Sequence, residues 1–167
     1  MTDVREVPTR EQRLIEELLA RVPHDPEHLL PTLQQVQVQL GHVPDAAIRA
    51  VAHAFNRSRA EVYGVVTFYH DLRLAPVGDT VVQLCMAEAC QAVGCRDLAA
   101  HASQHLGVPL GHTTADGRVH LEATYCLGNC ALGPSVRIGD AVHGRVSPHR
   151  FDTLVSAAVS AERERAQ

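Results

Sequence analysis

The chain has 167 residues, of which 46% are hydrophobic and 20% charged, so it can bury the core of one ordinary domain or of two small ones. Its formal net charge of −4 and its lack of tryptophan argue against nucleic acid as a partner. No apolar run reaches the roughly 20 residues of a membrane span, and the N-terminal MTDVREVPTR does not resemble a signal peptide, so we expect a cytoplasmic protein.

The first part of the chain predicts four helices. Apolar residues recur there every three or four positions, over about residues 10–22, 29–40, 45–55 and 58–66. Thr9 is placed to cap the first helix, and Ser58 with Glu61 three residues later forms a capping box for the fourth. Gly41 is a natural stop for the second.

The stretch APVGD, residues 75–79, marks the expected domain boundary, with a helical domain at 1–75 and a second domain at 76–167. The second domain alternates short β runs (80–85, 108–114, 118–126, 134–139 and 140–145) with helices at about 94–106 and 148–160. Asp116-Gly117 and Gly139-Asp140 are hairpin signals. One β-α-β unit followed by hairpins and a closing helix resembles thioredoxin. We expect the polar end, 161–167, to fray.

Four cysteines stand in two pairs: Cys85 and Cys90 are spaced C-x4-C, and Cys126 and Cys130 are spaced C-x3-C. Each pair follows a β-like run, and small residues surround all four. Thiolates bind iron and zinc well, and small residues let the backbone approach closely enough to donate hydrogen bonds to sulfur. In a cytoplasmic protein such cysteines are better metal ligands than disulfide partners.

The spacing alone leaves more than one metal open. Structural zinc sites usually contain a tight C-x2-C step, and a redox dithiol favours C-x-x-C, but neither spacing is present here. The spacing therefore favours an iron–sulfur cluster, with zinc as the alternative. The fifth cysteine, Cys95, falls in the first turn of a predicted helix, where a buried apolar residue is the better interpretation than a ligand.

Two other patterns invite functional interpretation. His101 and His105 lie one helical turn apart, a spacing that zinc can use, but no HExxH-like carboxylate accompanies them, and we expect solvated surface residues. His120 falls on a β segment without an evident partner. The helix pair around residues 45–66 resembles a helix-turn-helix, but its second helix has no basic residue after Arg59, which disfavours a DNA-binding regulator.

Several segments, in order, resemble the 24 kDa-type [2Fe–2S] subunit of NADH dehydrogenases: LLPTLQQVQVQLGHVPDAAI, SRAEVYGVVTFYHDL, the C-x4-C pair and YCLGNCALGPSV. Within that family, TTADGRVHLE and HGRVSPHRFDTLV look most similar to the gamma subunit of NAD-dependent, molybdenum-containing formate dehydrogenases. The resemblance implies an α+β protein, with an N-terminal helical bundle before a thioredoxin-like [2Fe–2S] ferredoxin domain. It implies one [2Fe–2S] cluster, held by the following residues: Cys85, Cys90, Cys126 and Cys130. Cys95 matches no ligand position.

The same resemblance implies a function. A cluster held by four thiolates has no open coordination position, so the chain would transfer electrons but would not be an enzyme alone. It would exchange single electrons with the FMN of a partner subunit that binds NAD, most similarly to formate dehydrogenase, where a further subunit holds molybdenum. The alternatives are the equivalent subunit of complex I or of an NAD(P)-linked hydrogenase, a zinc-stabilised interaction module, or a cluster-bearing DNA-binding regulator. The helical domain would serve for docking, with Tyr63, Phe68 and Tyr69 at the interface.

Overall fold

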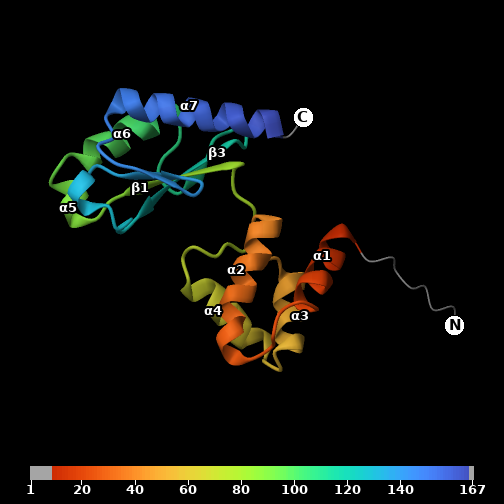
Figure 1. Ribbon diagram of the computed structural model, residues 1–167. Coiled ribbons are helices and arrows are strands. Elements are labelled where there is room, and N and C mark those ends of the chain that lie inside the picture. Colours follow the sequence, from red (N-terminus) through yellow and green to blue (C-terminus); the bar gives the residue numbers. More distant parts are fainter. Residues whose placement is uncertain (1–8, 166–167) are drawn as a thin grey trace, which may run out of the picture. The chain divides into compact units, whose positions relative to one another are not determined.

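The computed structural model describes residues 9–165, and the chain separates into two compact units between Pro76 and Val77 (Figure 1). The sequence placed this boundary between residues 75 and 76. Within the described part, no helix combines the length and the apolar character needed to cross a membrane. The expectation that the chain does not begin with a signal peptide concerns residues 1–8, which lie outside the described residues.

The first unit is helical throughout its regular structure. Its elements are α1 (Arg10–Leu19), the short 3-10 helix η1 (Pro26–His28), α2 (Leu29–Leu40), α3 (Asp45–Ala54) and α4 (Arg59–Phe68). Thr9 and Ser58 each accept a hydrogen bond from the backbone three residues on, which confirms both predicted caps. Gly41 ends α2 with φ 75°, as predicted, whereas α1 stops three residues short of its predicted end.

The apolar stripes of these helices meet in one core. Its fully buried side chains include the following: Leu33, Val36, Ile48, Val51, Val62 and Val66. The chain that leaves α4 is tied back to α2, because the Gln37 side chain accepts from the Arg73 backbone nitrogen at 2.6 Å. Val43 donates to the Arg73 carbonyl at 2.7 Å. These bonds hold the segment after α4 against the rest of the unit.

The second unit is built on a five-stranded mixed sheet. Its strands are β1 (Thr80–Cys85), β2 (His112–Thr113), β3 (Val119–Thr124), β4 (Val136–Ile138) and β5 (Ala141–His143), in the order β2-β3-β1-β4-β5. β1 and β3 are parallel and are joined through α6 (Cys95–Leu106), and the other pairs are antiparallel. Both predicted hairpins are confirmed, β2–β3 around Gly117 and β4–β5 around Gly139.

Helices α6 and α7 (Pro148–Arg165) pack on each other and on β1, so they cover the same face of the sheet (Figure 1). Val82, Leu84 and Leu121 point to them and are fully buried with Phe151 of α7.

Several of the side chains that alternate with these strand residues are polar. Gln83 donates to Glu122 at 2.7 Å, and Thr113 lies 2.9 Å from the Nδ1 atom of His120. The expectation that His120 has no partner is therefore wrong. Its partner comes from the neighbouring strand β2, and that pairing is not readable from the sequence near His120.

Two elements differ from the sequence prediction. The short helix α5 (Glu88–Gln91) was not predicted, because four residues carry too little periodicity. α7 continues to Arg165, so the expected fraying of 161–165 is wrong. Alanine, glutamate and arginine are strong helix formers, which favours continuation of the helix through these last turns. Residues 166–167 of the same predicted tail lie outside the described residues.

Candidate metal centre

The parallel pairing of β1 and β3 brings the two cysteine pairs to one edge of the sheet. Cys85 is the last residue of β1, and its register partner is Thr124, the last residue of β3. Cys126 follows Thr124 by two positions. Because parallel strands end at the same edge of a sheet, segments separated by 35 residues of sequence converge here.

The first pair is buried. Cys85 leaves the strand, and the chain then turns into α5, which carries Cys90. The Cys85 and Cys90 thiols are hydrogen-bonded to each other, and both are at least 98% buried. Together with Cys95 they form a small cluster that Met86 and Leu127 cover. The first pair is thus protected from water by its own surroundings.

The second pair lies in an exposed loop. The sulfur atoms of Cys126 and Cys130 are 3.6 Å apart, and the backbone nitrogen of Gly128 donates to the Cys126 sulfur at 3.4 Å. Cys126 has φ 89°, a conformation that non-glycine residues rarely adopt. Such a conformation persists only where the surroundings impose it, and it is often associated with a functional site.

Backbone donors converge on the sulfur of Cys85. Burial by itself raises the pKa of the Cys85 thiol, but the backbone N–H groups of Ala87, Leu127 and Cys126 and the thiol of Cys90 donate to it, and together they hold its pKa below the ordinary value. Two of these donors come from the second loop. The loop therefore contributes hydrogen bonds to the first pair as well as sulfur atoms of its own.

The pKa values of Cys90 and Cys130 depend on the thiols next to them. Burial and then the neighbouring Cys85 raise the pKa of Cys90, against the effect of the Ser135 backbone N–H. The hydrogen bond and the charge of Cys126 raise the pKa of Cys130. A cation in their midst is the usual way to hold several neighbouring thiolates together.

The arrangement of the sulfurs bears on the nature of that cation. A single zinc ion with Zn–S bonds of about 2.3 Å needs four sulfurs all about 3.8 Å from one another. Among the described residues, no three cysteine sulfurs lie within 4.8 Å of one another, and no cysteine joins a group of three ligand atoms at that distance. The thiols are close within each pair but do not converge on one point. This donor set, with its N–H···S contacts, fits a binuclear cluster better than a single ion.

Cys95 has a different setting. It is the first residue of α6, is 1% exposed, and has a pKa raised by burial and then by the charge of Cys85. No backbone donor contributes to this thiol. The structure thus places Cys95 beneath the first pair, in agreement with the interpretation of a buried apolar residue.

Sequence reasoning missed the support beneath the second loop. Arg145 donates to the Leu132 carbonyl at 2.6 Å, so the chain after β5 runs directly under the loop. A Cβ atom on Gly144 would meet the Asn129 side chain and the Leu132 Cβ atom, both at 2.7 Å. Only glycine fits at this position. No local sequence signal marks Gly144, since the close approach involves a segment twelve or more residues earlier.

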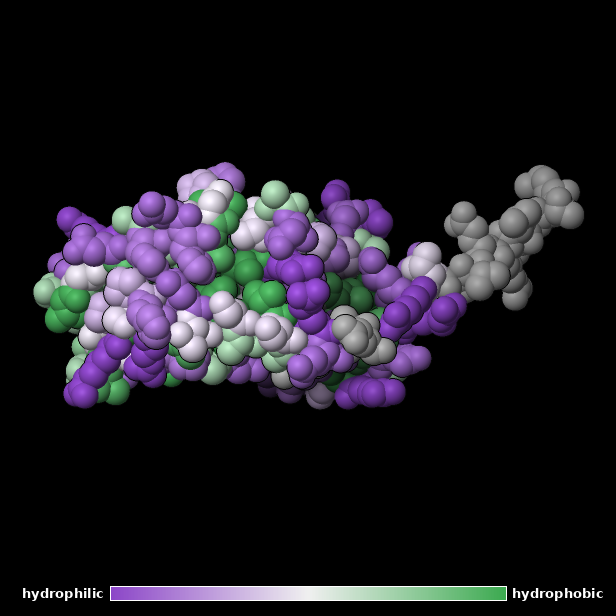
Figure 2. Space-filling view, turned by 90° about the horizontal axis from the view of Figure 1, so that it is seen from above, coloured by the Kyte–Doolittle hydropathy of each residue, from purple (hydrophilic) through white to green (hydrophobic). Residues whose placement is uncertain are grey.

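Apolar side chains border the two pairs. Tyr125, Val93 and Leu132 are neighbours in sequence of the cysteines and are 78%, 53% and 41% exposed. More generally, the face seen in the space-filling view is mostly hydrophilic, with smaller hydrophobic areas between the hydrophilic residues (Figure 2). Exposed apolar residues beside a redox centre are typical of a surface that another protein covers.

The helix pair α3–α4 offers little to nucleic acid. Arg59 and Arg49 both contact the carboxylate of Asp45, and Arg57 lies 3.6 Å from Glu61. These arginines already have acidic partners, so they are poorly placed to bind phosphates. The geometry therefore gives no support to the DNA-binding alternative.

Known proteins resemble this chain over most of its length. The profile of the thioredoxin-like [2Fe–2S] ferredoxin family matches residues 15–158. A component of the NADH-quinone oxidoreductase of Rhizobium meliloti (strain 1021) is 34% identical over 149 residues, which are 89% of each chain. The HndA component of the NADP-reducing hydrogenase of Solidesulfovibrio fructosivorans is 33% identical over 145 residues, which are 86% of this chain and 84% of the relative.

A solved structure shares the fold. It is the crystal structure of NAD+-reducing [NiFe]-hydrogenase in the air-oxidized state, with a TM-score of 0.70 and 22% sequence identity. The match covers 80% of this chain but only 23% of that hydrogenase chain. At this identity the likeness concerns the fold alone.

Proposed function

Because this chain belongs to the thioredoxin-like [2Fe–2S] ferredoxin family, we propose that it is an electron-transfer subunit of an NAD-linked oxidoreductase complex. One [2Fe–2S] cluster is the cofactor expected from the family. The observation that carries the proposal is the meeting of two thiol pairs at the shared end of β1 and β3. The ligands that we propose are the following: Cys85, Cys90, Cys126 and Cys130.

The surrounding residues suit a redox role. A [2Fe–2S] cluster supplies one-electron transfer, and hydrogen bonds to its sulfurs, together with solvent exposure, set its reduction potential. Here the N–H groups of Ala87, Leu127 and Gly128 stabilise charge on cysteine sulfur. Cys85 and Cys90 are buried whereas Cys126 and Cys130 are exposed, so we propose that the partner approaches on the Cys126–Cys130 side.

The names of the relatives support one type of complex over the other. They are subunits of NADH-quinone oxidoreductase and of an NADP-reducing hydrogenase, so they favour the alternative of complex I or a hydrogenase over formate dehydrogenase. We propose a flavin-containing, NAD-binding partner on this basis. The formate dehydrogenase assignment, with its molybdenum-containing subunit, stays a prediction from the sequence motifs alone.

The experiment that tests the cofactor is EPR spectroscopy of the anaerobically purified chain before and after reduction with dithionite, with iron and zinc assayed on the same sample. We expect a silent oxidised state, a rhombic S = 1/2 signal after reduction, and two irons per chain. Zinc without a signal would overturn the electron-transfer proposal and favour a zinc-stabilised interaction module.

A second experiment distinguishes the parent complexes. The tagged full chain is expressed in its source organism, purified with its native partners, and assayed for reduction of NAD+ by formate and by hydrogen, and for oxidation of NADH by quinone. We expect quinone- or hydrogen-linked activity, together with flavin in the purified complex. Formate-linked activity with molybdenum in the same complex would instead establish the narrower prediction.

A further inference from the structure

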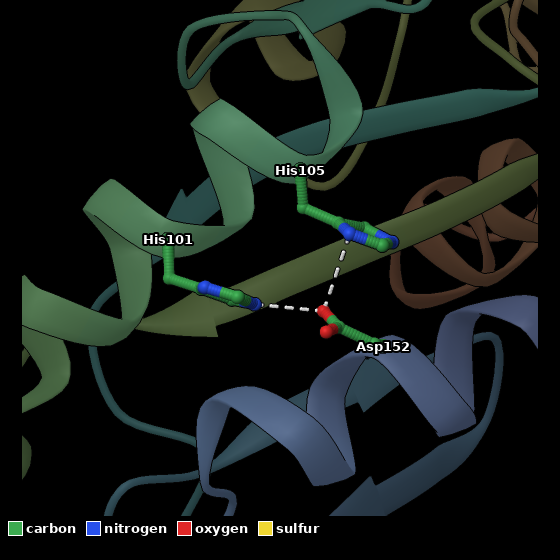
Figure 3. Close-up of side chains that lie close together, drawn as sticks. All are labelled: His101, His105 and Asp152. Carbon is green, nitrogen blue, oxygen red and sulfur yellow. Dashed lines mark hydrogen bonds and ion pairs between the residues drawn. The ribbon is translucent and has the colours of Figure 1, made fainter.

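Two histidines and an aspartate come together on the helical face of the second unit, where the sequence predicted only solvated histidines. His101 and His105 project from successive turns of α6 toward Asp152 on α7 (Figure 3). The Nε2 atom of His101 lies 2.7 Å from the Oδ1 atom of Asp152, and the Nδ1 atom of His105 lies 3.4 Å from the same oxygen. Both histidines are about one-third exposed, as expected of surface residues, but the sequence did not predict their contact with an aspartate about fifty residues later.

The imidazole rings are held in parallel. Their planes differ by 16°, with centroids 5.9 Å apart, and both rings pack edge-on against Phe151, which is fully buried. Phe151 precedes Asp152 in α7, so the same turn that supplies the carboxylate also orients the rings. The ring nitrogens of both histidines are thus directed to one point between the two helices.

The three ligand atoms suit one metal ion. They all lie within 4.8 Å of one another. Bonds of about 2.0–2.1 Å from zinc to nitrogen and oxygen place tetrahedral ligands about 3.4 Å apart, which is the His105–Asp152 distance already present. In a tetrahedral site the Nε2 atom of His101 moves outward from 2.7 Å, and the two histidine nitrogens, which lie within 4.8 Å of each other, settle at about the same 3.4 Å. The side chains are each about one-third exposed, so an ion can enter and water can occupy the fourth position.

We propose that His101, His105 and Asp152 form a binding site for one divalent transition-metal ion, such as Zn2+, that links α6 to α7. Two imidazoles with one carboxylate are the donor set that zinc, and other first-row ions with a preference for imidazole, bind in proteins. No cysteine belongs to this group, so the ion is separate from the proposed cluster. Its effect is to stabilise the helical layer that covers the sheet.

The test is a calorimetric titration of Zn2+ into the cluster-loaded, untagged full chain, with the visible absorption of the cluster followed to show that it stays intact. We expect one Zn2+ per chain and a higher thermal unfolding midpoint in its presence. His101→Gln with His105→Gln, and separately Asp152→Asn, should each weaken binding by at least about 10-fold. Asp152→Asn retains a hydrogen-bonding side chain of the same size, so it tests the ligand with little disturbance of packing.

The matched control is His28→Gln. His28, Asp25 and Glu27 form the other group of close ligand atoms among the described residues, but they belong to one short turn with exposed carboxylates. We expect this variant to bind Zn2+ as the parent does. Absence of binding by the parent chain, loss of binding in His28→Gln, or unchanged binding in the His101/His105 and Asp152 variants would overturn the proposal.

Zinc K-edge X-ray absorption gives an independent readout. We expect only nitrogen and oxygen neighbours at about 2.0–2.1 Å. Sulfur neighbours at about 2.3 Å would assign the ion to cysteines and contradict the proposed site.

Discussion

Cys95 tests the proposed ligand set at the level of single residues. It is as buried as Cys85 and Cys90, but no backbone N–H group acts on it. We predict that Cys95→Ala retains two irons per chain and the rhombic EPR signal. By contrast, serine at any of the four proposed ligands should reduce the iron content or change the g values of the signal.

Cys95 lies beside Cys85 and Cys90, so in a variant that lacks one of these two cysteines it can take over as a cluster ligand. The variant Cys90→Ser is therefore compared with the double variant Cys90→Ser, Cys95→Ala. Residual signal in the single variant that disappears in the double variant identifies substitution by Cys95. Loss of the signal in Cys95→Ala alone would contradict the proposed ligand set.

Gly144 is a second residue whose role can be measured. In Gly144→Ala the new methyl group meets Asn129 and Leu132 at distances that real Cβ atoms do not tolerate. Overpacking of this kind costs about 1–3 kcal/mol. We predict a correspondingly lower free energy of unfolding and an altered EPR signal, because the displaced segment carries Cys130.

The control for Gly144→Ala is Gly64→Ala. Gly64 is an exposed residue in α4, and apart from its chain neighbours and the backbone of its own helix, no atom lies within 4 Å of an added Cβ. Alanine there should stabilise the chain by about 0.5–1 kcal/mol and leave the EPR signal unchanged. Equal effects of the two substitutions in denaturant titrations would show that Gly144 does not support the loop.

At the residue scale, the sequence predicts features that depend on neighbouring positions but misses contacts between segments that are far apart in the sequence. The paired spacing and the β runs before Cys85 and Cys126 were sufficient to single out the thiols. Gly144 and Asp152 were not singled out, because their importance depends on contacts with segments far away in the sequence.

Among the elements, the N-terminal end of α4 contains a charged side chain, Glu61, whose contribution to the stability of the fold can be measured. The Ser58 backbone nitrogen and hydroxyl both donate to the Glu61 carboxylate at 2.8 Å, and these two hydrogen bonds, in that order, hold the pKa of Glu61 below its ordinary value near 4.5. A lowered pKa in the folded state means that ionised Glu61 stabilises the fold at neutral pH. This contribution is lost as the pH falls below about 4.5 and through the lowered pKa.

We predict that Glu61→Gln lowers the thermal unfolding midpoint at pH 7 and that the difference from the parent chain shrinks as the pH falls below 4.5. Comparing the two chains at each pH removes the effects of all other titrating groups. Glu17→Gln is the control, since Glu17 is exposed on α1 and only lies 3.9 Å from Arg21. A difference that stays constant with pH would contradict the assigned role of the carboxylate.

The elements themselves were predicted to different degrees. The caps at Thr9 and Ser58, the stop at Gly41 and the two hairpin turns are local hydrogen-bonding patterns, and all were readable, whereas the Gln12 partner of the Thr9 cap was not predicted. α5 was missed because it is a single turn, yet it positions Cys90. Its formation depends on the chain leaving β1 beside the second loop, which is a tertiary constraint rather than a local preference.

At the scale of the whole molecule, one face of α4 is buried in its own unit and the other face is exposed. Val62 and Val66 are fully buried and belong to the core of their own unit. Tyr63, Phe68 and Tyr69 are 45%, 72% and 42% exposed, and the rings of Phe68 and Tyr69 pack edge to face. Aromatic side chains are enriched in the centres of protein interfaces, so their exposure agrees with the docking role that we propose for the helical unit.

We therefore predict that Phe68→Ser combined with Tyr63→Ser weakens assembly with the flavin-containing partner without loss of the bound iron. The proposed cluster site lies entirely in the second unit, so the EPR signal of the free chain should remain that of the parent. Aromatic residues at the centre of an interface commonly contribute about 2 kcal/mol or more, so about a 30-fold weaker complex is expected. The measurement is the affinity of the purified variant for the partner by titration. Val38→Thr is the control, because Val38 is an apolar side chain of α2 that is 85% exposed, more than Tyr63 or Phe68, and threonine makes it polar at nearly the same size. An unchanged affinity in the double variant, or an equal loss in Val38→Thr, would show that α4 does not form the docking surface.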